Sequence, residues 1–213
     1  NFMKNIELKD SNKDDVSFLI IVPTLNSYKQ LRRLYISLKT QSYKNWRTIF
    51  IDGDSNLEHK KWVQSCCSDS RFLLIEENKN TRGIYPAMSQ GIENIIDQEW
   101  VIFLGSDDWF NSPFALEIMA NKIFCEENIK KINLLIYGTQ FVQINNNKIL
   151  RINNIPSGFM RNIGIHKMMF FGYMPMHHSV CFSSKVIKKF MPYDLKYKLA
   201  ADCDLFFRLF KSN

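Results

Sequence analysis

Short apolar segments alternate with amphipathic segments through the first half of this 213-residue chain. Four apolar runs have the length and continuity of strands that are buried on both faces: 17–22, 46–51, 71–75 and 100–104. In the segments between them, apolar residues recur at helical spacing: 31–38, 57–67 and 84–96. We therefore predict an α/β fold with a mostly parallel central sheet and helices on both faces.

Three of the predicted strands end in polar and acidic stretches: Pro-Thr-Leu-Asn at 23–26, Asp-Gly-Asp-Ser at 52–55 and Gly-Ser-Asp-Asp at 105–108. Ligands of open α/β sheets bind at the carboxyl ends of strands, so we expect these stretches to share one rim. The adjacent acids Asp107 and Asp108 repel each other unless a cation or strong donors compensate their charge. They fit either a solvated turn or a site for a hard divalent cation that holds phosphate oxygens.

The second half of the chain is less regular. We predict a helix at 112–126, a strand at 132–137 and a hairpin of 141–144 with 148–152. The segment 167–176 is dense in Met and aromatic residues, which favours core packing over a lip that faces lipid or an acceptor. A strand and a helix follow over 179–190, and an amphipathic helix covers 199–210. The sequence leaves open whether the natural chain extends past Asn213.

Composition narrows the class of protein. Hydrophobic residues make up 46% of the chain and aromatic residues 14%, which is enough for a sizeable core. The five cysteines show no CxxC pair, which favours free thiols in a reducing compartment. No apolar run approaches the roughly 20 residues of a membrane span, and no signal peptide opens the chain, so we expect a cytoplasmic protein. The glycine fingerprints of dinucleotide-binding and P-loop folds are absent from the sequence.

The net charge of +7 indicates anionic partners, which include nucleic acid, an anionic membrane surface and phosphorylated small molecules. The basic residues are scattered along the chain, and most lie on the polar side of predicted helices. Because they form no single basic block, a nucleic-acid-binding arm is disfavoured.

Six segments carry a family pattern in order across residues 17–210: IIVPTLN (20–26), LRRLYISLKTQSYKNWRTIFIDGDS (31–55), TRGIYPAMSQGI (81–92), VIFLGSDDWF (101–110), MHHSVCFSSKVIK (176–188) and LAADCDLFFRL (199–209). The sequence resembles the family 2 glycosyltransferases of the GT-A fold, particularly bacterial enzymes that build cell-surface polysaccharides. The resemblance implies a Rossmann-like, mostly parallel sheet with a smaller acceptor-side subdomain. It also implies an irregular lead-in at 1–16, a nucleotide-sugar-binding half at 17–110 and an acceptor-binding half at 111–213.

The resemblance assigns residues to the donor site. Asp52 would contact the nucleotide base, Asp107 the ribose or a metal ion, and Asp108 a Mg²⁺ or Mn²⁺ that bridges the donor diphosphate. Further donor contacts are implied at these positions: Thr24, Asn26, Asp54 and Arg82. Capping or turn formation explains Thr24 and Asn26 nearly as well, and a surface ion pair is an equal alternative for Arg82.

The resemblance also supplies a catalytic base. Inverting sugar transfer needs a hydroxyl to lose its proton as it attacks the anomeric carbon. Asp202 matches the family's base at the start of a late helix, although an acid favoured by the helix dipole is the alternative. Asp204 would orient the base or the acceptor. His177 matches a family histidine that contacts the acceptor or metal, and a structural histidine is equally consistent.

The resemblance implies an inverting transferase that moves a hexose or amino sugar from a nucleoside diphosphate sugar, with UDP favoured, to a glycan or lipid-linked acceptor. Peripheral contact with an anionic inner membrane would suit such an acceptor. Two alternatives stay open: a metal-dependent nucleotidyltransferase, and a non-catalytic domain that binds anions or nucleic acid.

Overall fold

The computed structural model describes residues 16–130, 133–143, 146–154, 165–170 and 172–211. The expected lead-in 1–16 lies outside these residues except for the buried Val16. Residues 144 and 145 at the tip of the expected hairpin, and Phe171 in the Met-rich segment, also lie outside them.

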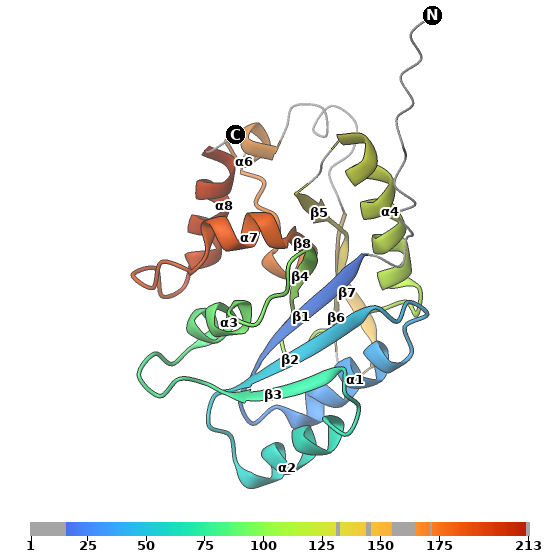
Figure 1. The fold of residues 1–213 in the computed structure, drawn as a ribbon, viewed down its shortest axis with the longest axis vertical. Helices are drawn as coiled ribbons and strands as arrows, with labels where there is room; N and C mark the ends of the chain where they lie inside the picture. The colour runs from blue at the N-terminus through green and yellow to red at the C-terminus, as the bar shows by residue number, and fades with distance from the viewer. Residues whose placement is uncertain (1–15, 131–132, 144–145, 155–164, 171, 212–213) are drawn as a thin grey trace, which may run out of the picture.

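A six-stranded sheet forms the centre of the molecule, with strand order β3-β2-β1-β4-β8-β5 (Figure 1). Four strands run parallel: β1 (Ser17–Thr24), β2 (Trp46–Asp52), β3 (Phe72–Glu76) and β4 (Glu99–Phe103). The strand β8 (Val180–Ser183) runs antiparallel to β4, and β5 (Leu134–Ile136) pairs antiparallel with β8. The chain builds outward from β1 to β3 and then returns to the other side of β1 with β4. The carboxyl ends of β1 and β4 therefore flank the point where the strand order reverses, which is where α/β sheets bind ligands.

Helices cover both faces of the sheet. One face packs against α1 (Tyr28–Lys39), α2 (Leu57–Cys66) and α4 (Ala115–Lys130). The opposite face packs against α3 (Ile84–Ile92), α6 (Ile165–Phe170), α7 (Ser184–Phe190) and α8 (Ala201–Lys211), which lie on the left of the sheet in Figure 1. Alternate residues of β1 point to opposite faces, so Ile20 and Val22 join the first cluster while Leu19 and Ile21 join the second.

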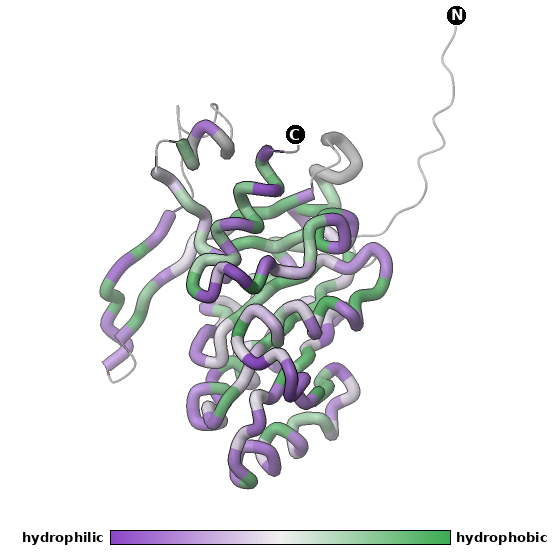
Figure 2. Tube along the Cα trace, turned by 90° about the vertical axis from the view of Figure 1, so that its left-hand side faces the viewer, coloured by the Kyte–Doolittle hydropathy of each residue, from purple (hydrophilic) through white to green (hydrophobic). Residues whose placement is uncertain are grey.

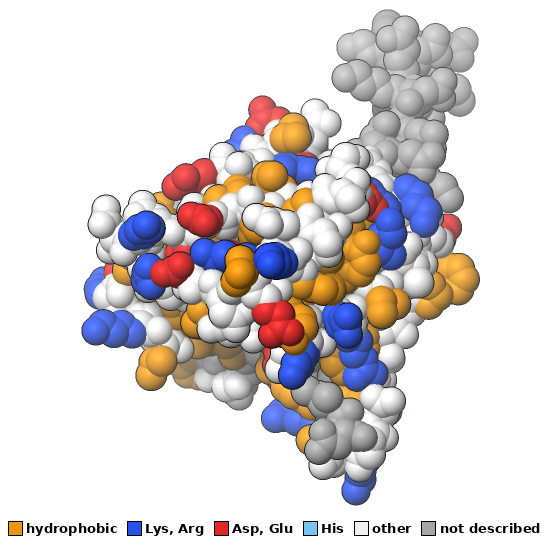
Figure 3. Space-filling view, turned by 90° about the horizontal axis from the view of Figure 1, so that it is seen from below, with side chains coloured by type: hydrophobic (Ala, Val, Ile, Leu, Met, Phe, Trp, Pro, Cys, Tyr) orange, Lys and Arg blue, Asp and Glu red, His pale blue; other side chains and the backbone are white. Residues whose placement is uncertain are grey.

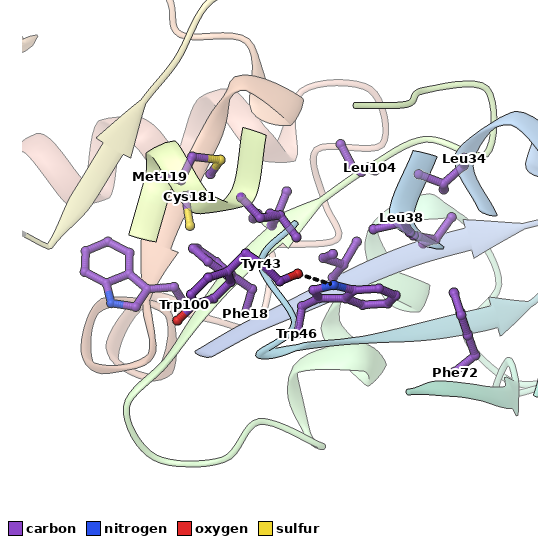
Figure 4. Packing of buried hydrophobic residues seen from close by; sticks show 14 of the residues in the cluster. Phe18, Leu34, Leu38, Tyr43, Trp46, Phe72, Trp100, Leu104, Met119 and Cys181 are labelled. Atoms are coloured by element: carbon purple, nitrogen blue, oxygen red, sulfur yellow. Dashed lines mark hydrogen bonds between the residues drawn. The ribbon is translucent and has the colours of Figure 1, made fainter. Parts of the chain in front are cut away.

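The first core cluster shows how large aromatic groups fill the space between α1 and the sheet (Figure 4). Leu34 and Leu38 of α1 are fully buried there, as their helical spacing predicts. The indole of Trp46 donates a hydrogen bond to the backbone oxygen of Tyr43 at 3.0 Å, so its polar edge is satisfied inside the core. The second cluster is equally tight, because a Cβ on Gly91 of α3 would lie 2.5 Å from Ile21. Gly91 therefore allows α3 to approach β1 closely.

A two-stranded hairpin stands apart from the central sheet, as Figure 2 shows on its left-hand side. It consists of β6 (Thr139–Gln143) and β7 (Lys148–Asn153), with a register irregularity between Phe141 and Val142. Side-chain hydrogen bonds connect the hairpin to the main body: Asn111 Nδ2 donates to Gln140 Oε1 at 3.1 Å, Arg33 Nη2 donates to Asn147 Oδ1 at 2.9 Å, and Thr139 Oγ1 donates to Met176 Sδ at 3.9 Å.

The predicted α/β fold with a mostly parallel sheet is confirmed. One helix is shorter than predicted: the segment 84–96 is helical only to Ile92. Beyond it, hydrogen bonds from Glu93, Asn94 and Ile95 reach back three residues, which tightens the chain into a turn before β4. No helix in the described parts of the chain has the length and apolar character needed to cross a bilayer.

Candidate active site

The ends of β1 and β2 place Thr24 and Asp52 side by side beneath the rim. Asp52 is 1% exposed and Thr24 is 4% exposed. The Thr24 hydroxyl donates to Asp52 Oδ1 at 3.4 Å, and the backbone N–H of Ser55 donates to Asp52 Oδ2 at 3.0 Å. The carboxylate of Asp52 is thus held by donors of the chain itself, which offsets the cost of burying its charge.

His59 of α2 is fully buried and lies next to both Thr24 and Asp52. Its Nδ1 accepts the backbone N–H of Ser27 at 3.1 Å, so a neutral ring carries its proton on Nε2. Nε2 lies 3.1 Å from Thr24 Oγ1 and 3.4 Å from Asp52 Oδ1. Burial lowers the pKa of His59 and favours the neutral ring, although the charge of Asp52 opposes this shift.

The exposed part of the same rim contains Asn26, Asp54 and Arg82. Asn26 and Asp54 both adopt positive φ, and Asn26 Oδ1 accepts the N–H of Asn56 at 2.8 Å. Asp54 pairs with Lys60 at 3.3 Å and with Arg82 at 3.2 Å. Hydrogen bonds from these two cations hold the pKa of Asp54 below its usual range, with that from Lys60 the stronger. The ion pair expected as the alternative for Arg82 is therefore present.

After the end of β4, the carboxylates of Asp107 and Asp108 both lie close to Gly105. The backbone N–H of Gly105 donates to Asp108 Oδ2 at 2.7 Å. A Cβ on Gly105 would lie 2.8 Å from Asp107 Oδ1 and 3.1 Å from Asp108 Oδ2. The missing side chain of Gly105 thus leaves the space in which both carboxylates converge.

The surroundings of Asp107 and Asp108 are poor in positive charge. No described lysine or arginine pairs with either carboxylate. Burial raises the pKa of Asp108, against the effect of the Gly105 hydrogen bond and of nearby His178. These two acids are therefore less completely satisfied by the chain than Asp52 is.

A cleft of about 410 Å³ opens beside the two acids. Its walls come from α3, the end of β4, the hairpin, the segment before β8 and the start of α8. The lining residues that carry polar or ionisable side chains are Tyr85, Asp107, Asp108, Trp109, Gln140, His177, His178 and Asp202. Four residues predicted from the sequence, Asp107, Asp108, His177 and Asp202, thus meet in one cleft.

Asp202 lies in the first turn of α8, where the helix dipole favours a negative charge. Tyr85 of α3 donates a hydrogen bond to Asp202 Oδ1 at 2.9 Å. Burial, together with this hydrogen bond, raises the pKa of Tyr85 to about 12, so the phenol stays protonated and remains a donor. The thiol of Cys203 is a further hydrogen-bonding neighbour of the Asp202 carboxylate.

His177 is enclosed by aromatic rings, and its Nε2 contacts the hydroxyl of Tyr193. Its ring centroid lies 4.8 Å from that of Phe103. Burial lowers the pKa of His177 to about 4, although the charge of Asp202 opposes the shift. The ring is therefore neutral near pH 7 and lies in the wall of the cleft.

Asp204 does not line this cleft. Its carboxylate accepts a hydrogen bond from Arg208 Nε at 2.7 Å, and Arg208 Nη1 also contacts the backbone oxygen of Phe190 at the end of α7. The structure thus gives Asp204 a clear role in joining α8 to α7.

Sequence reasoning missed Tyr85, His59 and Trp109 as candidates. Tyr85 lies in the family segment TRGIYPAMSQGI (81–92), and Trp109 directly follows Asp107 and Asp108. Their positions in the sequence could therefore have marked both residues as candidates. The guanidinium of Arg33 stacks 3.7 Å from the Trp109 ring centroid, which places this indole between α1 and the cleft. Nothing in the sequence around His59 indicates its partners, because they come from β1, β2 and the residue before α1.

The acid pair has the chemistry of a partial site for a divalent cation. Carboxylate oxygens are the ligands that Mg²⁺ and Mn²⁺ prefer, and Gly105 leaves room for both of them. The described residues contain no cluster of three or more His, Cys, Asp or Glu side chains that could hold a metal. A cation at Asp107 and Asp108 would therefore need further oxygen ligands from a bound molecule.

Solved structures share this architecture. S. aureus TarS residues 1–349 in complex with UDP superposes with a TM-score of 0.67 at 16% identity, covering 91% of this chain and 55% of that one. A mannosyltransferase, PcManGT from Pyrobaculum calidifontis in complex with GDP-Man and Mn²⁺, gives a TM-score of 0.57 at 12% identity, covering 87% of this chain and 50% of that one. The chain thus spans about half the length of these structures, and its fold is the GT-A fold of glycosyltransferases.

Sequence comparisons add the family. The model of "Glycosyl transferase family 2" matches residues 19–190. A PGL/p-HBAD biosynthesis glycosyltransferase of Mycobacterium tuberculosis is 26% identical over 204 residues, covering 92% of this chain and 70% of the relative. Glycosyltransferase GlyA of Streptococcus pneumoniae is 30% identical over 110 residues, covering 51% of this chain and 15% of the relative. The chain belongs to glycosyl transferase family 2.

Proposed function

We propose that this chain transfers a hexose or amino sugar from a nucleoside diphosphate sugar to a hydroxyl acceptor, with inversion at the anomeric carbon. The observation that carries the proposal is that one cleft is lined by the acid pair Asp107 and Asp108 and by Asp202. A diphosphate-holding group and a base are the two functions that this reaction needs near one carbon atom. The proposal assigns residues 17–110 to the donor and 111–213 to the acceptor.

Asp108, with Asp107 beside it, would hold a Mn²⁺ or Mg²⁺ ion together with the donor diphosphate. When bound, such an ion offsets the negative charge that develops on the departing nucleoside diphosphate. Burial without a paired lysine or arginine suits Asp108 to this task, since a cation satisfies a carboxylate that the chain leaves unpaired. Mn²⁺ is present in the solved PcManGT complex, which supports metal use in proteins of this fold.

Asp202 is the proposed base. A carboxylate oxygen of Asp202 accepts the proton of the acceptor hydroxyl while the hydroxyl oxygen bonds to the anomeric carbon. The bond from that carbon to the diphosphate oxygen breaks, and its electron pair leaves with the nucleoside diphosphate. Tyr85 positions Asp202 by donating a hydrogen bond to Oδ1.

The nucleotide would lie at the ends of β1 and β2, with Thr24, Asn26, Asp52, Asp54 and Arg82 around it. Arg82 is 51% exposed and pairs with the 59% exposed Asp54, so it can turn towards a phosphate at small cost. Asp52 is held by its own chain and offers a base only a narrow contact. We propose a UDP-linked donor, which the solved complexes of TarS with UDP and UDP-GlcNAc support.

The acceptor would be a glycan or a lipid-linked sugar used in surface polysaccharide synthesis, with His177 in contact with it and Asp204 acting through α8. Cytoplasmic residence with peripheral contact to an anionic inner membrane fits the exposed lysines on α7 and the 85% exposed Phe170. Flotation with anionic vesicles checks the membrane contact, and recovery of all protein in the pellet fraction would count against it.

Nucleic-acid binding receives less support. On the face drawn in Figure 3, Lys and Arg side chains are interspersed with acidic and hydrophobic ones, and no continuous basic surface is visible there. Nucleotidyl transfer would use similar acids but release pyrophosphate instead of a nucleoside diphosphate.

The decisive experiment measures which product leaves the donor. Purified protein is incubated with UDP-, GDP-, CMP- and dTDP-linked sugars, each with Mn²⁺ or EDTA, and donor binding is followed by thermal shift. We expect Mn²⁺-dependent binding of one class and release of its nucleoside diphosphate. Asp202→Asn should keep donor binding and lose transfer by roughly 10²–10⁴-fold, as expected for removal of a general base. Release of sugar 1-phosphate from the donor, as in nucleotidyl transfer, or near-normal transfer by Asp202→Asn, would overturn the proposal.

A further inference from the structure

A second cavity, of about 460 Å³, lies between α4 and the hairpin. Its volume falls within the roughly 300–1,000 Å³ typical of small-molecule sites. Its apolar walls come from α4, the hairpin and the loop after β4: Ala115, Ile118, Met119, Val142, Ile152 and Phe110. None of the described residues that line it is Lys or Arg, so the cavity offers little to a phosphate group.

This cavity adjoins the catalytic cleft. Five residues line both spaces: Asp108, Trp109, Gln140, Val142 and His178. Gln140, Phe141 and Val142 all line the cleft, and Gln140 and Val142 also line the cavity, beside the register irregularity between Phe141 and Val142. A molecule that extended from the cleft past Trp109 and Val142 would reach the second cavity.

The order of strands places the cavity away from the nucleotide. The proposed nucleotide site lies at the ends of β1 and β2, on one side of β4. The cavity is lined by Tyr137 and Gly138, which follow β5 at the opposite edge of the sheet. Asp108 lies at the end of β4 between these two sites, so the cavity is on the opposite side of Asp108 from the proposed nucleotide site.

We propose that this cavity binds an apolar group, alkyl or aryl, of the acceptor whose hydroxyl is presented to Asp202. The inference rests on the proposed function and adds the chemical class of the acceptor. A free glycan would leave these walls in contact with water, whereas an acyl or aryl group would bury them. The 62% exposed Ile118 and the 51% exposed Ile152 extend the apolar wall outward to the protein surface, along which a longer chain could continue.

Binding of octyl and methyl β-D-glucopyranoside tests the proposal without any need for turnover. Both are titrated below the critical micelle concentration of the octyl compound, and tryptophan fluorescence is recorded because Trp109 lines both spaces. Each buried methylene strengthens binding by about fourfold. We therefore expect the octyl compound to bind at least tenfold more tightly than the methyl compound.

Two variants locate the effect. Ile118→Asp places a charge in the cavity wall, and Ala115→Phe fills the cavity. Each should remove most of the octyl advantage. Ile36→Asp on α1 is the matched control, since Ile36 is 61% exposed on a helix and does not line the cavity. Thermal unfolding checks that all three variants fold.

Equal affinity for the two glucosides in the wild type, or an octyl advantage retained in both cavity variants, would overturn the inference. Loss of the advantage in Ile36→Asp as well would show adsorption to the surface only, and would overturn it too. Failure of the proposed function is distinguished by the donor assay, because Mn²⁺-dependent donor binding and product identity are measured without either glucoside.

Discussion

Two acidic strand ends of the same sheet differ in how completely the chain satisfies them. At the end of β2, Asp52 is 1% exposed and accepts hydrogen bonds from Thr24 and Ser55, with His59 beneath. At the end of β4, Asp107 and Asp108 converge over Gly105, and Asp108 accepts one backbone hydrogen bond. Both are short stretches of Asp, Gly and Ser after a buried strand, so their sequences look alike.

The difference separates a structural role from a ligand-dependent one. An acid with a full set of partners contributes to stability, and its removal leaves buried donors unsatisfied. An acid that is partly buried without a cation disfavours its own charged form, and gains most when a ligand supplies the missing charge. We therefore expect changes at Asp52 to appear mainly in stability, and changes at Asp108 mainly in activity.

Asp108→Ala should have the largest effect. We expect transfer to fall by roughly 10³-fold, because a metal ion supplies several kcal/mol of charge stabilisation in the transition state. Stability without ligand should stay the same or rise, since a partly buried acid is removed. Steady-state kinetics and thermal unfolding check both parts. Asp97→Asn, which alters an exposed acid that pairs with Lys188 and does not line the cleft, is the control and should retain most activity.

Asp52→Asn should lower the free energy of unfolding by about 2 kcal/mol, because the amide group turns a donor towards the N–H of Ser55 or the ring of His59. Urea denaturation of the ligand-free protein measures this value. Loss of activity without loss of stability would instead support the direct contact with the nucleotide base that the family resemblance implies.

Histidines near both strand ends should make stability depend on pH. The folded pKa of His177 is about 4, below the usual unfolded value near 6.5. Its stabilising contribution is thus present above pH 6.5 and is lost as the pH falls towards 4, because the unfolded chain binds the proton first. His59 shifts in the same direction.

Between pH 7 and pH 5, His177 alone should cost about 2 kcal/mol of stability. His177→Gln should therefore lose about 2 kcal/mol less than the wild type over this range, while the contribution of His59 remains. Urea denaturation at the two pH values measures the difference. An identical pH dependence in both proteins would show that His177 titrates normally.

Gly105→Ala should have the smallest effect of the four. Its Cβ would push the carboxylates of Asp107 and Asp108 apart, since it would lie 2.8 Å and 3.1 Å from their oxygens. We expect roughly tenfold weaker activation by Mn²⁺, with little change in stability, because these side chains can rotate away. A Mn²⁺ titration of transfer measures it, and Gly138→Ala, next to the second cavity, is a matched control. Unchanged activation would argue against convergence of the two acids on one ion.

Much of the fold could be predicted from the sequence because burial imposes simple periodicities. The continuous apolar run of β1 and the spacing of Leu31, Leu34 and Leu38 each indicate one kind of element. The end of α3 was not predicted, since Ile95 and Ile96 continue an apolar pattern while the backbone already turns towards β4. The hairpin was expected, but its position over the cleft follows from the distant contacts of Arg33 and Asn111.

By itself the sequence determined the alternation of strands and helices, the acids at the strand ends and the resemblance to a family of transferases. These features can be read from short stretches of sequence, because residues that are neighbours in the chain lie in the same helix or strand and follow its burial pattern. Only the tertiary structure decided which acids are satisfied and which are open, that Tyr85 holds Asp202, and that an apolar cavity adjoins the cleft. The physical reason is that hydrogen bonds and cavities join residues far apart in the chain, as Tyr85 and Asp202 are. Their partners are set by how the helices pack on the sheet.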